Sequence, residues 1–135
     1  MNRICIKMES LPENISFARV AIAAFISPFD PTVGETSDIK TAVSEAVTNA
    51  VIHGGPDPFE MILTSHEKKF TIEVSDTGIG INDIEAARQP LFTTKQDMER
   101  SGLGFTVMES FMDTVEVEST PGSGTKVTMT KIIKG

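Results

Sequence analysis

Two polar side chains, Glu45 and Asn49, lie four residues apart in a segment whose apolar residues repeat with helical spacing. On a helix they would share one flank, at the edge of the apolar stripe. That stripe consists of Ile39, Val43, Ala46, Val47 and Ala50. A partly desolvated glutamate can act as a general base, and an asparagine oxygen can coordinate Mg²⁺. A solvated glutamate and an asparagine near a helix end would show the same spacing, so the pair alone does not decide between these interpretations.

A second segment, Asp76-Thr77-Gly78-Ile79-Gly80, follows a run that predicts a strand. Its glycines permit a ligand to approach the backbone closely, and the aspartate can accept a hydrogen bond from an exocyclic amine such as N6 of adenine. Aspartate and glycine are also the commonest turn residues. The triplet Asp76-Thr77-Gly78 occurs in aspartic proteases as well, which pair two such aspartates. Three helical segments that periodicity indicates, not counting one short helix, argue against that largely β class.

Two further glycine-containing segments precede a predicted helix and a predicted strand. Arg100-Ser101-Gly102-Leu103-Gly104-Phe105 opens a helix, where free backbone N–H groups attract anions and Arg100 can offer a guanidinium to a terminal phosphate. An N-cap at Ser101 followed by a hinge is the alternative. Gly122-Ser123-Gly124-Thr125 fits a hairpin, although Thr125 can equally bond a base. The order of all four segments predicts a metal, a base pocket and a phosphate cradle around one cleft, which indicates ATP and Mg²⁺.

The elements that must position these segments follow from hydrophobic periodicity. Strands are predicted at residues 3–9, from 59 through 63, from 70 through 74, at 115–119 and at 126–132, and helices at 14–28, 36–53, 84–88 and 103–112. The aperiodic stretch that precedes the last helix is a candidate lid, at about residues 90–104. Because the strands alternate instead of being continuously apolar, we predict an α+β two-layer sandwich. Its sheet would be mixed and largely antiparallel, with helices packed on one face.

Composition limits the possible partners. A length of 135 residues predicts a single domain, 1–135. The formal charge of −7 argues against nucleic acid as a ligand, because binding a phosphate backbone requires clustered cations. No stretch approaches the roughly 20 apolar residues of a membrane span, Cys5 is the only cysteine, and the first residues alternate instead of forming a signal peptide. We therefore expect a cytoplasmic protein.

The four segments resemble the boxes of the GHKL superfamily of ATPases and kinases, whose ATP-binding domain has the Bergerat fold. Glu45 to Asn49 looks like the N box, Asp76 to Gly80 like the G1 box, Ser101 to Gly104 like a short G2 box, and Gly124-Thr125 like the final box. Longer matches are similar to the anti-sigma-F family of stage II sporulation proteins, at Ser16 to Val20, Ser44 to Gly54, Ala87 to Lys95 and Glu99 to Phe105. Two departures are a connection from Gly54 to Phe59 that is shorter than in close relatives, and Ser101 where distant members have glycine. The serine occurs in the sporulation kinases themselves.

The resemblance implies roles for individual residues. Glu45 would be the catalytic base, Asn49 the Mg²⁺ ligand, Asp76 the adenine contact and Arg100 a γ-phosphate contact. The remaining nucleotide contacts would be Gly78, Gly80, Thr94, Ser101, Gly102, Leu103, Gly104, Phe105 and Thr125.

The resemblance also implies an activity and partners. The protein would be a homodimeric, ATP-dependent protein-serine/threonine kinase that holds the sporulation sigma factor F inactive and phosphorylates a serine of its anti-anti-sigma factor. Arg19 would contact the sigma factor and Thr48 the anti-anti-sigma factor. Two alternatives stay open: a general-stress-type anti-sigma kinase, and a nucleotide-gated binding module without kinase activity.

Helical projection adds an expectation about the surfaces of two helices. Thr48 projects away from the apolar stripe of its helix, so it would face solvent or a partner. On the first helix Arg19, Ile22 and Ile26 project together, and we predict that this face is an interface. The opposite face would be the core side, with Phe17, Val20, Ala21 and Ala24.

Overall fold

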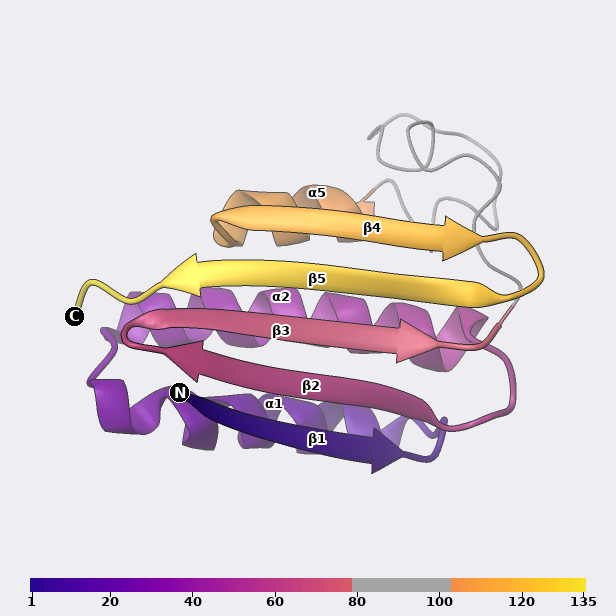
Figure 1. The fold of residues 1–135 in the computed structure, drawn as a ribbon, viewed down its shortest axis with the longest axis horizontal. Helices are drawn as coiled ribbons and strands as arrows, with labels where there is room; N and C mark the ends of the chain where they lie inside the picture. Colours follow the sequence, from indigo (N-terminus) through magenta and orange to yellow (C-terminus); the bar gives the residue numbers. More distant parts are fainter. Residues whose placement is uncertain (79–102) are drawn as a thin grey trace.

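A five-stranded sheet covered on one face by helices forms the molecule in a computed structural model, which describes residues 1–78 and 103–135 (Figure 1). The strands are β1 (Asn2–Met8), β2 (Phe59–His66), β3 (Lys69–Asp76), β4 (Thr114–Thr120) and β5 (Gly124–Ile132). The helices are α1 (Glu13–Ile26), the 3₁₀ turn η1 (Ser27–Phe29), α2 (Val33–His53) and α5 (Leu103–Phe111). The strand order is β1-β2-β3-β5-β4, and all four described pairings are antiparallel. The predicted α+β fold class is confirmed.

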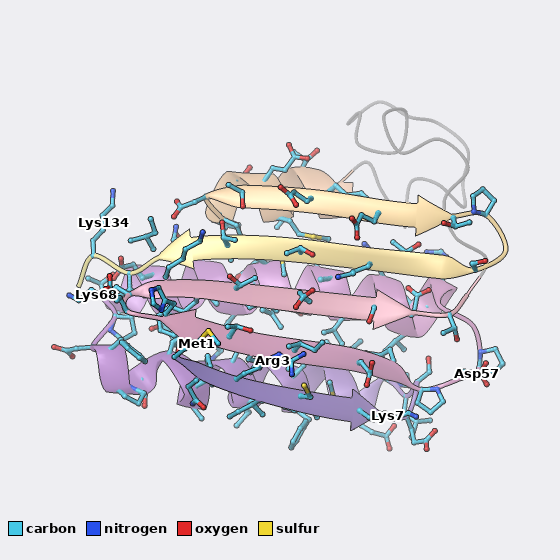
Figure 2. All side chains as sticks on the ribbon, in the orientation of Figure 1. Met1, Arg3, Lys7, Asp57, Lys68 and Lys134 are labelled. Carbon is cyan, nitrogen blue, oxygen red and sulfur yellow. The ribbon has the colours of Figure 1, made fainter. Side chains whose placement is uncertain are left out.

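The core lies between the sheet and the helices. Along β2 every second residue is buried, from Phe59 through Met61 and Leu63 to Ser65, which is the alternation that the sequence predicted. On α2 the predicted apolar stripe is buried as well. The other face of the sheet carries polar side chains, among them Arg3 and Lys7 of β1 (Figure 2). Among the described residues, no helix is both long and apolar enough to span a membrane.

Helix α1 buries the opposite face from the one that we predicted. Ala18, Ile22 and Ile26 are fully buried, whereas Phe17 and Val20 are 52% and 67% exposed. The predicted interface of Arg19 with Ile22 and Ile26 is therefore wrong, because both isoleucines belong to the core. The reason is that α1 carries apolar residues on both faces, so that periodicity alone does not identify the buried one. An apolar surface at Phe17 and Val20 is left exposed instead.

Helix α2 begins three residues earlier than predicted because a capping box closes its first turn. The Thr32 hydroxyl accepts a hydrogen bond from the Glu35 amide at 3.0 Å, and the Glu35 carboxylate accepts one from the Thr32 amide at 2.9 Å. Glu35 also accepts hydrogen bonds from the backbone amides of Lys134 and Gly135. The bond from Lys134 is the largest cause, followed by that from Thr32, of a Glu35 pKa of about 2. The helix start is thus joined to the last residues of the chain.

Three glycines allow the end of α2, the end of β3 and the start of β5 to touch through their backbones. A Cβ atom on Gly78 would lie 2.5 Å from the Gly54 carbonyl carbon, and one on Gly54 would lie 2.7 Å from the Asp76 Cβ. On Gly124, whose φ is +114°, it would lie 2.1 Å from the Asp76 carbonyl oxygen. These contacts are too short for any side chain. They fix Asp76 against the C-terminal end of α2.

A pair of glycine substitutions tests this close approach. We expect Gly124→Ala to lower the free energy of unfolding by about 2–3 kcal/mol, because the new Cβ overlaps backbone and the left-handed φ is strained. Gly34→Ala is the control, since the nearest atom to its Cβ would be 3.9 Å away in the first turn of α2, and we expect it to stabilise by about 0.4–1 kcal/mol. Urea denaturation measures both. Equal effects of the two substitutions would contradict the close approach.

Candidate functional site

The C-terminal half of α2 and the first turn of α5 bring three of the predicted site residues together. A Cβ on Gly104 would lie 3.5 Å from Asn49 Nδ2 and 3.6 Å from Glu45 Oε2, so the backbone of α5 passes directly beside both side chains. Glu45 and Asn49 share this flank of α2 because they are one helical turn apart. The predicted pairing of the Glu–Asn motif with the glycine segment is therefore realised in space.

The Asn49 side chain is buried at this junction with an unused hydrogen-bonding group. Asn49 is 8% exposed, and its Nδ2 has no hydrogen-bond partner in the part of the chain that the structure describes. Leaving a buried amide without a partner costs about 1–3 kcal/mol, a cost that a ligand offering a hydrogen-bond acceptor to Nδ2 would remove. An unsatisfied buried amide of this kind is typical of a ligand-binding site. The Asn49 side-chain oxygen is also suited to coordinate Mg²⁺.

Glu45 has the electrostatic setting of a proton acceptor. It is half-buried on α2, and burial raises the pKa of its carboxyl group above the ordinary value of 4.5. Desolvation has this effect because it disfavours the charged form. A carboxylate with a raised pKa takes up a proton more readily than an exposed one, which is the property that a general base requires.

A pocket between α2 and the sheet combines apolar walls with two polar groups from neighbouring strands. Asp76 at the end of β3 and Thr125 at the start of β5 lie opposite each other in the register. The pocket is lined by Ala46, Asn49, Ala50, Val74, Asp76, Phe105, Thr125 and Val127. Asp76 Oδ1 accepts a hydrogen bond from the Gly78 amide at 2.9 Å, which holds the carboxylate in place. The volume among the described residues is only about 10 Å³, less than a heteroaromatic base fills, so a base would enter only if the walls moved apart. The chemistry of the lining, apolar walls with a fixed hydrogen-bond acceptor, is the kind that suits a flat base with an amino group.

Several predicted residues lie outside the described part of the chain. These are Gly80, Thr94, Arg100, Ser101 and Gly102, together with the predicted helix at 84–88 and nearly all of the candidate lid. Leu103 opens α5, but its side chain is likewise not described. Phe105 is 1% exposed, and its ring packs in the core and lines the pocket. Its backbone amide lies in the first turn of α5.

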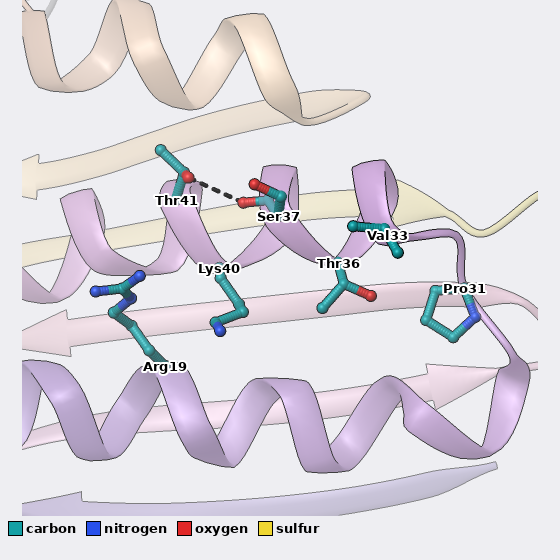
Figure 3. A pocket seen from close by; sticks show the side chains of 7 residues that line it. All are labelled: Arg19, Pro31, Val33, Thr36, Ser37, Lys40 and Thr41. Atoms are coloured by element: carbon teal, nitrogen blue, oxygen red, sulfur yellow. Dashed lines mark hydrogen bonds between the residues drawn. The ribbon is translucent and has the colours of Figure 1, made fainter.

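Arg19 and Thr48 lie away from this pocket. Arg19 is exposed on α1 and points into a groove between α1 and α2, where Lys40 points toward it from α2 (Figure 3). The groove has a volume of about 320 Å³ and is lined by Arg19, Pro31, Val33, Thr36, Ser37, Lys40 and Thr41. Within residues 1–78 and 103–135, neither cation makes an ion pair. Thr48 is half-buried, and its hydroxyl donates to the Ser44 carbonyl at 2.6 Å.

Two residues near these sites were not predicted. Lys40 is half-buried on α2, and only the position of α1 shows that it lines one groove with Arg19. Ser119 on β4 makes a hydrogen bond with the Thr125 hydroxyl at 2.9 Å. Its part in the site depends on the pairing of β4 with β5, which the turn residues Pro121 to Gly124 indicated but did not align.

Comparisons with known proteins show what the chain is similar to. The family model for the histidine kinase-like ATPase domain matches residues 8–131. Curated proteins named anti-sigma F factor are 58% identical in a Thermoanaerobacter species, over 92% of this chain and 89% of that protein, and 48% identical in Bacillus subtilis, over 96% and 92%. A solved structure of the RsbU and RsbW domains of a Mycobacterium tuberculosis protein superposes with a TM-score of 0.73 at 17% identity, covering 98% of this chain and 33% of that chain. That structure supports the fold.

The raised pKa of Glu45 has a measurable effect on stability. A carboxyl group that binds its proton more tightly in the folded state than in the unfolded state makes the fold less stable as the pH rises through its pKa. We therefore expect the stability of Glu45→Gln relative to the wild type to increase as the pH rises above the ordinary carboxyl pKa of 4.5, as measured by thermal unfolding. Glu60→Gln, on the exposed side of β2, controls for the loss of one charge. A constant difference between Glu45→Gln and the wild type would show that burial does not disfavour the Glu45 carboxylate.

Proposed function

Since the chain belongs to the histidine kinase-like ATPase domain family and, within it, to the anti-sigma F factors, we propose that it is an ATP-dependent protein-serine kinase. It binds and inhibits sporulation sigma factor F, and it phosphorylates a serine of the anti-anti-sigma factor. The observation that carries the kinase proposal is the meeting of Glu45, Asn49 and Gly104 beside the pocket of Asp76 and Thr125. One end of α2 thus holds a base, a metal ligand and a nucleotide pocket.

The residues of the site divide the work of phosphoryl transfer. Glu45 would take the proton of the substrate serine hydroxyl while the serine oxygen bonds to the γ-phosphorus of ATP, the bond from that phosphorus to the β,γ-bridging oxygen breaks, and ADP leaves. Asn49 would hold Mg²⁺ through its side-chain oxygen, and Asp76 would accept a hydrogen bond from the amino group of adenine. Arg100 and the backbone from Ser101 to Phe105 hold the phosphates. When bound, Mg²⁺ and ATP supply charge neutralisation and the transferred group.

Partner binding uses two other surfaces. We propose that Arg19 contacts the sigma factor and that Thr48 contacts the anti-anti-sigma factor. The first proposal is supported by the exposure of Arg19, which lines a groove with Lys40. Among the described residues, Arg19 makes no ion pair. Thr48 lies three residues after Glu45 on α2, so a substrate protein that docks there is within reach of the base.

A homodimer is the third part of the proposal, and the edge of the sheet supports it. Among the described strands, β1 pairs only with β2, which leaves one side of β1 open. Beside this edge Ile4, Phe17 and Val20 are 42%, 52% and 67% exposed. Open strand edges and exposed apolar patches commonly mark association surfaces. A second copy of the chain that packs with β1 and α1 would bury all three side chains.

Replacing the base tests the kinase activity. We expect Glu45→Gln to reduce transfer of labelled phosphate from ATP to the anti-anti-sigma factor by at least about 100-fold, the usual contribution of a general base. ATP binding, measured by calorimetry, should persist because the amide has nearly the same shape. Glu60→Gln is the control on the exposed face of β2. Normal phosphorylation by Glu45→Gln would show that Glu45 is not the base.

A charge placed on the apolar surface of α1 tests the dimer. We expect Val20→Asp to convert the dimer into a monomer, because an unpaired carboxylate would have to be buried at the interface. Light scattering coupled to size-exclusion chromatography measures the mass. Ile52→Asp provides the control, since Ile52 is 56% exposed on α2. A Val20→Asp protein that keeps the mass of a dimer would exclude this surface.

A further inference from the structure

The outer face of α2, away from the sheet, carries a large apolar side chain in line with Glu45. Residues seven apart on a helix differ by only about 20° in direction, so Ile52 lies almost directly beyond Glu45 along the helix. Thr48 lies between them on the same face. Ile52 is 56% exposed, whereas the predicted apolar stripe of this helix is buried. The proposed function gives roles to Glu45 and Thr48 and none to Ile52.

A second exposed apolar residue lies at the same end of the helical layer. The Ser10 hydroxyl donates to the Val51 carbonyl at 3.3 Å, and this bond joins the turn before α1 to the last turns of α2. Leu11, the next residue in that turn, is 45% exposed. Leu11 and Ile52 therefore leave apolar surface in solvent at the end of α2 that carries the site. Neighbouring exposed apolar side chains commonly mark a contact surface.

The occupant of this surface follows from the reaction that Glu45 would catalyse. A protein whose serine hydroxyl reaches the Glu45 carboxylate must cover the outer face of α2 around that residue. Ile52 lies about 10 Å further along the helix, at a rise of 1.5 Å per residue, and an extended chain covers this distance in about three residues. An aliphatic side chain offers no hydrogen bond or charge to the phosphates of a nucleotide. The substrate protein is therefore the partner that fits.

We propose that Ile52, with Leu11 beside it, is a docking site for the substrate protein and receives an apolar side chain about three residues from the serine that is phosphorylated. The inference rests on the proposed function, because it requires Glu45 to act on a protein hydroxyl. Burial of the exposed half of Ile52 favours association through the hydrophobic effect. The contact holds the substrate serine beside Glu45 and contributes nothing to nucleotide binding.

Steady-state phosphorylation of the anti-anti-sigma factor by the full chain, at saturating Mg²⁺ and ATP, tests the proposal. We expect Ile52→Ser to raise the KM for the substrate protein about tenfold, because half of an isoleucine is no longer buried in the complex. The kcat and the dissociation constant of ATP should keep their wild-type values, and Ile52→Leu should restore the KM. Ile132→Ser is the control, since Ile132 is 48% exposed at the end of β5 remote from Thr125.

Variants of the substrate protein locate the contact. Each apolar residue within four positions of the phosphorylated serine is replaced by serine in turn. We expect one such replacement, about three positions away, to raise the KM of the wild-type kinase and to have no further effect on the KM of Ile52→Ser, because the two side chains touch each other. Additive effects of every replacement with Ile52→Ser would contradict the assigned contact.

The outcomes separate docking from a structural role. An unchanged KM in Ile52→Ser, or an equal rise of the KM in Ile132→Ser, would overturn the proposal. So would a loss of ATP affinity in Ile52→Ser that matches the rise in KM, which would assign Ile52 to the folding of the site. A lower mass of Ile52→Ser in light scattering would assign it to contact with a second copy instead. Wild-type protein that transfers no phosphate would refute the proposed function itself, whereas an active wild type with an unchanged KM in Ile52→Ser would refute only the docking site.

Discussion

Backbone contact at Gly54, Gly78 and Gly124 determines the geometry of the site. Each glycine occupies a position where a Cβ atom would overlap the neighbouring chain, so the end of α2, the end of β3 and the start of β5 meet with no side chains between them. Asp76 and Thr125 on the sheet consequently lie in one pocket with Asn49 on the helix. Bulkier residues at these positions would separate the helix from the sheet edge and divide the pocket.

The site also carries an energetic cost that the rest of the fold offsets. Asn49 is buried with an amide nitrogen that no described residue satisfies, and burial disfavours the charge on Glu45. Both residues lie on α2, whose buried stripe packs against the sheet and whose first turn is closed by Thr32 and Glu35. A long, well-capped helix can hold polar groups in unfavourable surroundings because packing along its other face supplies the stability. Strain of this kind is expected where a ligand binds.

The sequence allowed the site to be predicted more securely than the surfaces. The apolar stripe of α2 has a single face, so it determined the direction of Glu45 and Asn49, and the order of the glycine segments indicated their common cleft. Helix α1 is apolar on both faces, and the choice between Phe17 with Val20 and Ile22 with Ile26 depends on how it packs against α2. The contact of Ser119 with Thr125 depends on the register between β4 and β5, which no residue pattern specifies to a single position.

The central claim is that one pocket, at the end of α2, holds the nucleotide. A crystal structure of the chain with Mg²⁺ and a non-hydrolysable ATP analogue tests it most directly. The account predicts the base between Asp76 and Thr125, the metal on the Asn49 side-chain oxygen, and the γ-phosphate beside Glu45. A nucleotide bound instead in the groove of Arg19 and Lys40 would contradict it. So would a Mg²⁺ ion that the Asn49 side-chain oxygen does not coordinate.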